Sequence, residues 1–504
     1  MKLGIMGLPQ SGKSTVFASL TGARGHKEDS SSSKIDTKVA VVTVFDERID
    51  FLSKIYKPKR EKMKSTRRSF LKASVAVPFI LPSTLSAAGT AANGQLRVGM
   101  IGMGKQADGL ANSFMPRAHV VAVCDVDTTR REHFLNKVNE FYTNYPESGK
   151  AECKAYVNYE DIIARDDIDS VCIATPDHWH TQIVLDAVGS GKDVYCEKPL
   201  THDIAEAVEI MKTVGKSGRI LQTGSMQRSM REFRVAAELV RNGVIGKVKR
   251  VEVSFWGPGI PCDLPEEPME PGLDWNRWLG PAPMRPYNSV LSPRGVHDHF
   301  PDWRRFREYG GGGVADWAPH HLDIAHWAMG MDDSGPTEIL PPEDKKAPFG
   351  ARLIYPNGVD VEHKEGNGLE FFGTDGYLYV NRGKINLELD GKTVAKFLDR
   401  QDGGTLNHKL SFIEDEYLKD ATIHLYKVNG SHTDDFMRCV KSRTKPVAHE
   451  MIGAHTVIAT HLMNLAYYHG QAMKWDPKKY TFVGGTGDVK WLTGSRRDYK
   501  KAIV

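Results

Sequence analysis

From residue 96 onward, short apolar runs alternate with longer segments whose apolar residues have helical spacing. Five runs have the length and β-branched content of strands buried on both faces of a sheet. They are LRVGMIG (96–102), HVVAVCD (119–125), SVCIATP (170–176), DVYCEKP (193–199) and RILQTG (219–224). Strands that alternate with helices at this interval are typical of βαβ units. The pattern therefore predicts an α/β domain with a parallel sheet over residues 96–223.

A glycine turn follows the first of these strands. Gly102, Gly104 and Ala107 have the GxGxxA spacing of a dinucleotide-binding turn. The two glycines permit a tight turn and a close approach of a pyrophosphate to the helix N-terminus behind it. We therefore expect these three residues to form part of a cofactor site.

Asp125 ends the second strand, twenty-one residues after Gly104. A carboxylate at this point can accept hydrogen bonds from both hydroxyls of a nucleotide ribose, and it repels a 2′-phosphate. This favours NAD, while the neighbouring Arg130 and Arg131 partly offset the repulsion and keep NADP as the alternative.

Two later strands also end in polar side chains. IATPDHWH (173–180) ends a strand and opens a helix, and YCEKPL (195–200) ends the next strand. Open α/β sheets bind ligands at the carboxyl ends of their strands. A lysine in this place, Lys198, is unusual as a core residue, which makes it a candidate functional residue.

The order of GxGxxA, Asp125, ATPDHWH, EKP and the later DWAPHHLD (316–323) resembles the Gfo/Idh/MocA oxidoreductases, especially their exported bacterial members, over roughly residues 96–500. The resemblance implies a Rossmann-like NAD(P)-binding domain and a C-terminal α+β domain (224–504) with a mixed, largely antiparallel sheet and helices on one face. It also implies that the chain forms a homo-oligomer through the open face of that sheet. The cofactor site it implies adds four residues to the glycine turn and Asp125: Thr175, Pro176, His180 and Glu197.

The chemistry implied by the resemblance converges on Lys198, Asp316 and His320. The segment VADWAPHHLDIAHWAMG (314–330) follows a run of glycines and has helical spacing, which places Asp316 and His320 one turn apart on one face. His320 is the expected general base, Lys198 polarises the reacting oxygen, and Asp316 positions the substrate and His320. The identity of the base stays open between His320 and Lys198.

The first 62 residues follow a different pattern. MKLGIMGLPQSGKST (1–15) has the GxxxxGKS spacing of a phosphate-binding loop, with Gly7, Gly12, Lys13 and Ser14 as its candidate nucleotide ligands. The stretch resembles the start of Obg-like P-loop GTPases or ATPases, and the resemblance stops at about residue 62 without a second nucleotide-binding strand. We interpret residues 1–62 as a truncated P-loop fragment.

Residues 63–95 resemble a twin-arginine signal peptide. Arg67 and Arg68 precede an apolar run (73–85) and small residues (86–88), and the prolines within the run argue against a membrane-spanning helix. Export to the periplasm is expected if translation starts at Met63, and a cytoplasmic location if residues 1–62 are retained.

Composition narrows the remaining choices. The chain has 504 residues, 67 basic and 63 acidic side chains, and a formal net charge of +4, which gives no reason to expect a nucleic-acid partner. The six cysteines form no CxxC pair, and the histidines around VHDHF (296–300) lack a metal-binding spacing, so we expect no metal. Trp256, Trp275, Trp278 and Trp303 can either stack on sugar rings or belong to the core. Arg228 and Arg304 can either bind an acidic sugar or pair with carboxylates.

The leading hypothesis is an NAD(P)-dependent oxidoreductase acting on a sugar, polyol or sugar derivative, with no stable insertion in a membrane. One alternative is a glycoside-cleaving enzyme that oxidises its sugar transiently, eliminates the aglycone and returns the electrons. A second alternative, from another class, is a P-loop GTPase or ATPase fused to a sensor module. A sugar-binding relative without activity is disfavoured because Lys198, Asp316 and His320 occur together.

Overall fold

The computed structural model describes residues 94–499. The P-loop-like residues Gly7, Gly12, Lys13 and Ser14 and the arginine pair at 67–68 lie outside the described residues, so their roles stay predictions. Within the described part, no helix combines the length and the apolar content that crossing a bilayer requires.

The first domain is built on a six-stranded sheet in which every pairing is parallel. Its strands are β1 (Arg97–Ile101), β2 (His119–Cys124), β3 (Lys154–Tyr156), β4 (Ser170–Ile173), β5 (Asp193–Cys196) and β6 (Leu221–Thr223). The order is β3-β2-β1-β4-β5-β6, so the direction of winding reverses between β1 and β4. A crevice forms at such a switch point, beyond the carboxyl ends of the strands. The predicted parallel sheet is confirmed. The short, partly exposed strand β3 was not predicted, because its sequence contains no apolar run.

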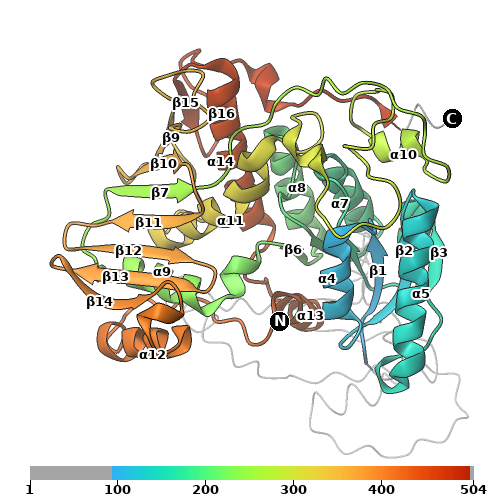
Figure 1. Cartoon of the computed structure of the whole chain (residues 1–504), viewed down its shortest axis with the longest axis horizontal. Helices are drawn as coiled ribbons and strands as arrows, with labels where there is room; N and C mark the ends of the chain where they lie inside the picture. Colours follow the sequence, from blue (N-terminus) through green and yellow to red (C-terminus); the bar gives the residue numbers. More distant parts are fainter. Residues whose placement is uncertain (1–93, 500–504) are drawn as a thin grey trace, which may run out of the picture. The chain divides into compact units, whose positions relative to one another are not determined.

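Two layers of helices cover this sheet (Figure 1). They are α4 (Lys105–Phe114), α5 (Thr128–Asn144), α6 (Tyr159–Ile163), α7 (His180–Gly189) and α8 (Ile204–Ser217). Helices α4 and α5 share one apolar core with the sheet, and α6, α7 and α8 share another. The helix α13 (His432–Ser442), far along the chain, joins the first core, where the ring of Phe436 meets Phe114 edge-on at 6.3 Å.

The second domain contains a ten-stranded sheet of order β14-β13-β12-β11-β7-β10-β9-β8-β15-β16. Its strands are β7 (Arg250–Ser254), β8 (Glu338–Leu340), β9 (Arg352–Ile354), β10 (Asp360–Lys364), β11 (Gly368–Phe372), β12 (Gly376–Asn381), β13 (Lys384–Leu389), β14 (Lys392–Phe397), β15 (Met473–Asp476) and β16 (Thr481–Phe482). β7 and β10 are parallel neighbours, and the other strand pairs of this sheet are antiparallel. The mixed, largely antiparallel sheet is confirmed.

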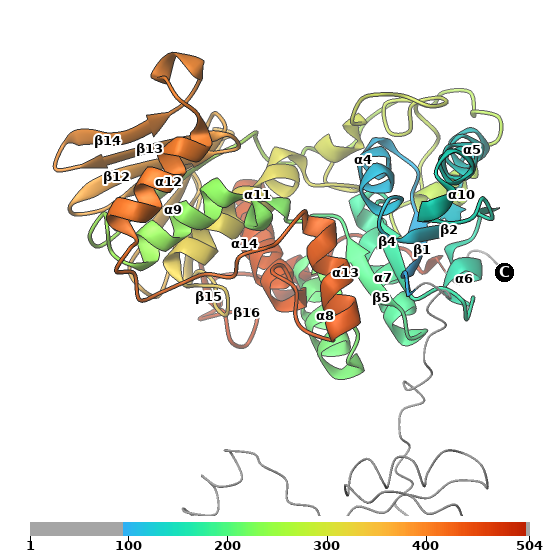
Figure 2. The ribbon, with the colours of Figure 1, turned by 90° about the horizontal axis from the view of Figure 1, so that it is seen from below.

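Helices line one face of the ten-stranded sheet, as Figure 2 shows for α9 and α12 beneath β12–β14. The helices of this layer are α9 (Arg231–Arg241), α11 (Gly312–Met329), α12 (Leu406–Tyr417) and α14 (Glu450–His469). The helix α11 packs against both α9 and α14, and α14 also packs against α8 of the first domain. Because α11 is enclosed in this way, most of its side chains are buried. The helix predicted over residues 314–330 is confirmed. Its packing against α9 and α14 fixes its orientation.

A long irregular segment, residues 256–311, connects β7 to α11 and extends over the first domain. It contains the short helix α10 (Trp275–Leu279) and has a small apolar core of its own around Trp278. The Asp274 N–H donates to the Val126 carbonyl (3.1 Å), and the Trp179 ring N–H donates to the Trp278 carbonyl (3.0 Å). We call this segment the crossing segment. These bonds place it beside the carboxyl ends of β2 and β4.

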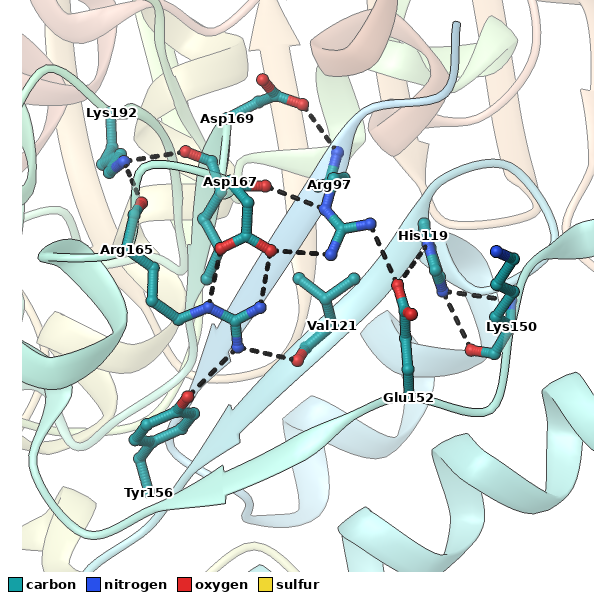
Figure 3. A network of polar contacts seen from close by, with 11 residues as sticks. Arg97, His119, Val121, Lys150, Glu152, Tyr156, Arg165, Asp167, Asp169 and Lys192 are labelled. Carbon is teal, nitrogen blue, oxygen red and sulfur yellow. Dashed lines mark hydrogen bonds and ion pairs between the residues drawn. The ribbon is translucent and has the colours of Figure 1, made fainter. Parts of the chain in front are cut away.

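The opposite end of the parallel sheet is held by ion pairs (Figure 3). Arg97, at the start of β1, donates to the carboxylate of Asp167 at 2.7 Å, and Arg165 donates to both oxygens of the same carboxylate at 2.9 and 2.7 Å. Lys192, directly before β5, donates to the carbonyls of Arg165 and Ile168 at 2.6 and 2.9 Å. We call these groups the amino-end network. Their hydrogen bonds tie the loop before β4 to the starts of β1 and β5.

Candidate functional site

The glycine turn after β1 has the backbone geometry that its sequence predicts. Gly102 has a φ of +86°, and a Cβ there would lie 2.6 Å from the Thr175 amide nitrogen, so only glycine fits. A Cβ on Gly104 would meet nothing within 4 Å, and the helix α4 that begins behind it has no side-chain cap. The turn therefore leaves open space in front of a helix N-terminus, which suits a pyrophosphate. Ala107 is fully buried against the sheet and gives close helix packing.

The side chain of Asp125 holds the glycine turn through a hydrogen bond. Its carboxylate accepts the Met103 N–H at 2.7 Å and the Asp127 N–H at 2.8 Å. Burial raises the pKa of Asp125, while the charge of Arg130 and these two hydrogen bonds oppose the rise. Each carboxylate oxygen keeps acceptor capacity, so Asp125 can still bind ribose hydroxyls at the edge of the turn.

The two arginines beside Asp125 are already engaged. Arg130 donates to the Gly295 carbonyl at 3.2 Å and to the Ser292 hydroxyl at 3.3 Å, both in the crossing segment. Arg131 donates to the Asp125 carbonyl at 2.8 Å and to the Thr128 hydroxyl at 3.2 Å. Both guanidiniums thus already donate to protein oxygens, and Arg130 is held by the crossing segment.

A cleft of about 920 Å³ extends from the glycine turn along the carboxyl ends of β1, β2 and β4. We call it the cofactor cleft. Gly102, Gly104, Asp125, Thr175 and Pro176 line it, together with side chains of the crossing segment. Five of the eight predicted cofactor residues therefore face one cavity. The crossing segment supplies the other wall. Trp278 and Trp303, two of the tryptophans singled out in the sequence, line it, and so does His297 of the VHDHF segment; Arg277 and Ser292 were not predicted.

A second cavity, of about 1030 Å³, adjoins the first. We call it the inner pocket. All three predicted catalytic residues, Lys198, Asp316 and His320, line it. Its wall is shared with the cofactor cleft at four residues: Gln106, Ala174, Thr175 and Arg304. The two cavities are thus contiguous.

Lys198 and Asp316 form the central pair of the inner pocket. The Lys198 ammonium donates to the Asp316 carboxylate at 2.6 Å and to its backbone carbonyl at 2.8 Å. Burial alone would raise the pKa of Asp316, but Lys198, Arg304 and Arg382 together hold it below its usual value. Asp316 is therefore a carboxylate that orients an ammonium group, and its side chain binds Lys198 rather than His320.

His320 faces the same pocket in its neutral form. It is 5% exposed, and its Nδ1 is buried without a hydrogen-bond partner. Burial lowers the pKa of His320 well below its usual value, and the positive charges of Lys198 and Arg382 lower it further. A neutral imidazole can accept a proton, so His320 retains the chemistry of a base.

His180 and Glu197 lie in the inner pocket rather than in the cofactor cleft. The ring nitrogens of His180 stand 2.7 Å from the Pro199 carbonyl and 3.0 Å from the Thr175 carbonyl. Burial lowers the pKa of His180 to about 4, although both carbonyl contacts oppose the change. His180 thus connects the chain after β4 to the chain after β5.

Glu197 is buried, and its carboxylate accepts a hydrogen bond from the side-chain amide of Gln106 at 3.0 Å. Burial raises its pKa, while the Lys198 charge and this hydrogen bond act in the opposite direction. Through Gln106, Glu197 connects the strand end that carries Lys198 to the first turn of α4. The cofactor turn and the inner pocket are thus held together by side chains.

Several residues that line the inner pocket were not among the predicted site residues. Arg382 comes from the turn between β12 and β13, where a lone arginine is usually solvated. Trp317 and Asp177 also line the inner pocket. Asp177 is part of the ATPDHWH segment, so its position at a strand end could have identified it. Nothing local marks Arg382, because the hairpin that carries it lies far away in sequence.

The remaining candidates are now placed. Trp275, Trp278 and Trp303 are buried, whereas Trp256 is 55% exposed and lines the inner pocket. Arg228 is fully buried and pairs with the carboxylates of Asp323 and Asp332, so its partners are internal. Between residues 94 and 499, no three histidine, cysteine, aspartate or glutamate side chains gather as a metal site would require.

Comparison with known proteins agrees with this geometry. Residues 96–225 match the Gfo/Idh/MocA family model described as "Oxidoreductase family, NAD-binding Rossmann fold", and residues 238–351 match the model described as "Oxidoreductase family, C-terminal alpha/beta domain". The WlbA dehydrogenase of Bordetella pertussis, solved with NADH and UDP-GlcNAcA, has the same fold: 14% identity, a TM-score of 0.50, and coverage of 76% of this chain and 99% of that one.

Two relatives are similar in sequence. A glycosyl hydrolase family 109 protein of Shewanella sp. (strain ANA-3) is 28% identical over 210 residues, which cover 38% of this chain and 45% of the relative. An inositol 2-dehydrogenase of Rhodococcus jostii (strain RHA1) is 29% identical over 167 residues, which cover 33% of this chain and 43% of the relative. The chain thus matches less than half the length of these curated relatives.

Proposed function

We propose that this chain, which belongs to the Gfo/Idh/MocA oxidoreductase family, is an NAD-dependent oxidoreductase of a sugar, polyol or sugar derivative. The observation that carries the proposal is the wall that the two cavities share. The cofactor cleft, which Gly104 lines, borders the pocket that contains Lys198, Asp316 and His320. An electron acceptor bound in one cavity is thereby adjacent to a substrate bound in the other.

The described residues fit a dinucleotide. Gly102 and Gly104 would hold the pyrophosphate at the start of α4, and Asp125 would bind the ribose hydroxyls. Thr175 and Pro176 would line the nicotinamide end. When bound, the cofactor supplies the acceptor for the two electrons that leave the substrate carbon.

The protein's own side chains handle the proton. In oxidation of an alcohol to a carbonyl, neutral His320 removes the hydroxyl proton. The ammonium of Lys198 donates a hydrogen bond to the oxygen as negative charge develops on it. Asp316 keeps that ammonium in position, 2.6 Å away. His180 and Glu197 hold the ends of β4 and β5, from which Lys198 extends.

A cofactor titration followed by steady-state kinetics tests this proposal. We expect saturable NAD binding and substrate-dependent NADH formation with a sugar or polyol from a stereochemically varied panel. His320→Gln should lower kcat much more than it changes KM, by about 10²-fold or more, because it removes a base and leaves the pocket's shape. Absence of nicotinamide binding to the purified full-length chain would refute the proposal.

A second candidate function is transient oxidation during glycoside cleavage. The crossing segment favours it, because this segment lines one wall of the cofactor cleft and is bonded to the first domain. A cofactor held under such a wall is suited to remain bound while it is reduced and reoxidised within one turnover. The similarity to the glycosyl hydrolase family 109 protein points in the same direction.

The two candidates differ in their use of NAD. If oxidation is transient, glycosides release their aglycone with catalytic NAD and no accumulation of NADH. If oxidation is net, NADH accumulates in equal amount with product. Absorbance at the NADH band, recorded together with aglycone release, decides between them.

For the N-terminal region we propose that residues 63–95 direct export by the twin-arginine route and that residues 1–62 are dispensable for the oxidoreductase. We also propose that the chain forms a homo-oligomer. Sequencing the N-terminus of the mature protein tests the first proposal, with a start near Ala88 expected. If Lys13→Ala alters the sugar-dependent activity, the P-loop fragment is not dispensable. Light scattering of the purified protein tests oligomerisation.

A further inference from the structure

Arg382 brings a positive charge to the inner pocket that no carboxylate neutralises within ion-pairing distance in residues 94–499. Its guanidinium lies 4.9 Å from the ring centroid of Trp317, and its Nε is buried without a hydrogen-bond partner. The side chain is half-buried, and burial lowers the pKa of Arg382 against the opposing charges of Asp316 and Glu197. Such a group is costly to keep in a pocket unless a ligand supplies the counter-charge.

The acidic side chains of the pocket do not supply that charge. Asp316 is already shared between Lys198 at 2.6 Å and Arg304 at 3.6 Å. Asp177 and Glu197 are the other two acids in the wall, and burial raises the pKa of both, towards the neutral form.

The histidines of the pocket, His180 and His320, add no positive charge, since burial keeps both neutral at pH 7. Three basic side chains, Lys198, Arg304 and Arg382, line the pocket. Lys198 and Arg304 both lie within ion-pairing distance of Asp316, whereas Arg382 has no carboxylate at that distance among residues 94–499.

We propose that Arg382, with Arg304, binds a carboxylate on the substrate, so that this enzyme acts on a sugar acid rather than on a neutral sugar. The planar guanidinium presents paired N–H donors that match a carboxylate bidentately. Arg304 extends from the crossing segment and rests 4.3 Å from the Trp303 ring centroid, which leaves it oriented at the junction of the two cavities. The inference rests on the proposed function, since it names the substrate class of that same site.

The rest of the pocket suits the sugar that would carry this group. Trp256 and Trp317 line the pocket with their ring centroids 5.1 Å apart, and aromatic rings of this kind pack against the apolar faces of sugar rings. Lys198 comes from the first domain and Arg382 from the second. A sugar acid in the pocket can therefore present a hydroxyl to Lys198 and its carboxylate to the arginines.

Matched pairs of sugars test the inference. The probes are D-glucuronate and D-glucose, D-galacturonate and D-galactose, and D-mannuronate and D-mannose, each titrated into the NAD-loaded full-length protein and followed by tryptophan fluorescence and calorimetry. We expect at least one uronate to bind about tenfold or more tightly than its neutral partner. Arg382→Gln should remove that ratio, and Arg382→Lys should restore part of it. D-glucose 6-phosphate is included to learn whether a phosphate replaces the carboxylate.

Arg250→Gln is the matched control. Arg250 lies in β7 of the same domain with its guanidinium 4.1 Å from the Phe372 ring centroid, and it does not line the inner pocket. The ratio of uronate affinity to neutral-sugar affinity should be unchanged in this variant. Equal affinity within every pair, no saturable binding of any uronate, tighter binding of the 6-phosphate than of glucuronate, or an unchanged ratio in Arg382→Gln would each overturn the inference. Failure of NAD itself to bind would instead refute the proposed function.

Discussion

Two lysines mark the two ends of strand β5, and their surroundings differ. Lys192, directly before the strand, is 7% exposed and gives its ammonium to two backbone carbonyls of the amino-end network. Lys198, just after the strand, gives its ammonium to Asp316 of the other domain and lines a cavity. Lys192 thus stabilises the fold by binding backbone carbonyls, whereas Lys198 places its charge in a cavity that can hold a ligand.

The same contrast holds for the two ends of the whole parallel sheet. At the amino end, Arg97 and Arg165 share the carboxylate of Asp167, and cations and anions match (Figure 3). At the carboxyl end, the Thr175 hydroxyl and His320 Nδ1 are buried without partners. Both residues line the inner pocket, where a bound ligand can supply the missing hydrogen-bond partners.

The largest effect is expected from Lys198→Met. Loss of the ammonium removes the donor to the reacting oxygen, so kcat should fall by about 10³-fold. The free energy of unfolding should change little, because the variant leaves Asp316 next to Arg304. Steady-state kinetics and urea denaturation measure the two quantities. A variant that loses stability and activity in parallel would show that Lys198 is mainly structural.

Acid should weaken the carboxyl end first. Burial lowers the pKa of both His178 and His180 to about 4, below the value of about 6.5 in an unfolded chain. Between these values the unfolded state binds more protons, so the free energy of unfolding should fall as pH drops from about 6.5 to 4, by on the order of 3 kcal/mol for each histidine. Arg165 and Arg97 hold the pKa of Asp167 below its usual value, so the amino end loses its stabilisation only at lower pH.

Urea denaturation at a series of pH values measures this slope. The variant His178→Phe should flatten it by removing one titrating group. A slope that is unchanged in His178→Phe would contradict the assignment to this end of the sheet.

A smaller effect, on stability rather than chemistry, is expected from Lys192→Met. The change removes the Lys192 hydrogen bonds to the carbonyls of Arg165 and Ile168 and leaves the Arg165 carbonyl with the Ile168 N–H at 3.4 Å as its only donor among residues 94–499, which should cost about 2 kcal/mol of unfolding free energy. At temperatures where the variant is folded, kcat should match the parent protein. A loss of kcat in Lys192→Met without a loss of stability would contradict the division of the sheet into a structural amino end and a functional carboxyl end.

The smallest effect is expected at Gly104. A methyl group there meets no protein atom, so Gly104→Ala should fold normally, yet it should weaken NAD binding about tenfold because it occupies the space before α4. Gly109→Ala, in the same helix and also facing open space, is the control and should leave NAD binding unchanged. A calorimetric NAD titration of both variants makes the comparison. Equal NAD affinity in the two variants would remove Gly104 from the cofactor site.

Much of the parallel sheet and of its functional end could be predicted from local sequence. Apolar runs identify buried strands. Gly102 identifies the turn, because few other residues tolerate its φ of +86°. Lys198 followed from its place at a strand end, since parallel strands end at one edge. β3 was missed because three half-exposed residues carry no apolar signal.

The helical spacing of Asp316 and His320 predicted a pair that the fold does not make. Residues one turn apart are neighbours on a helix, but a neighbour from another domain can offer a stronger partner. Lys198 brings a full charge to 2.6 Å, and a neutral histidine has none to offer. Periodicity therefore placed Asp316 and His320 on one face of a helix without revealing what Asp316 binds.

The sequence alone determined the α/β class, the glycine turn and the strand ends that carry Asp125 and Lys198, because periodicity and backbone sterics are local properties. Tertiary structure alone decided the pairing of Lys198 with Asp316, the crossing segment over the cofactor cleft and the presence of Arg382 in the inner pocket. These contacts join residues separated by more than a hundred positions or by whole domains. No local pattern encodes them, since they arise only when two separately patterned sheets are packed against each other.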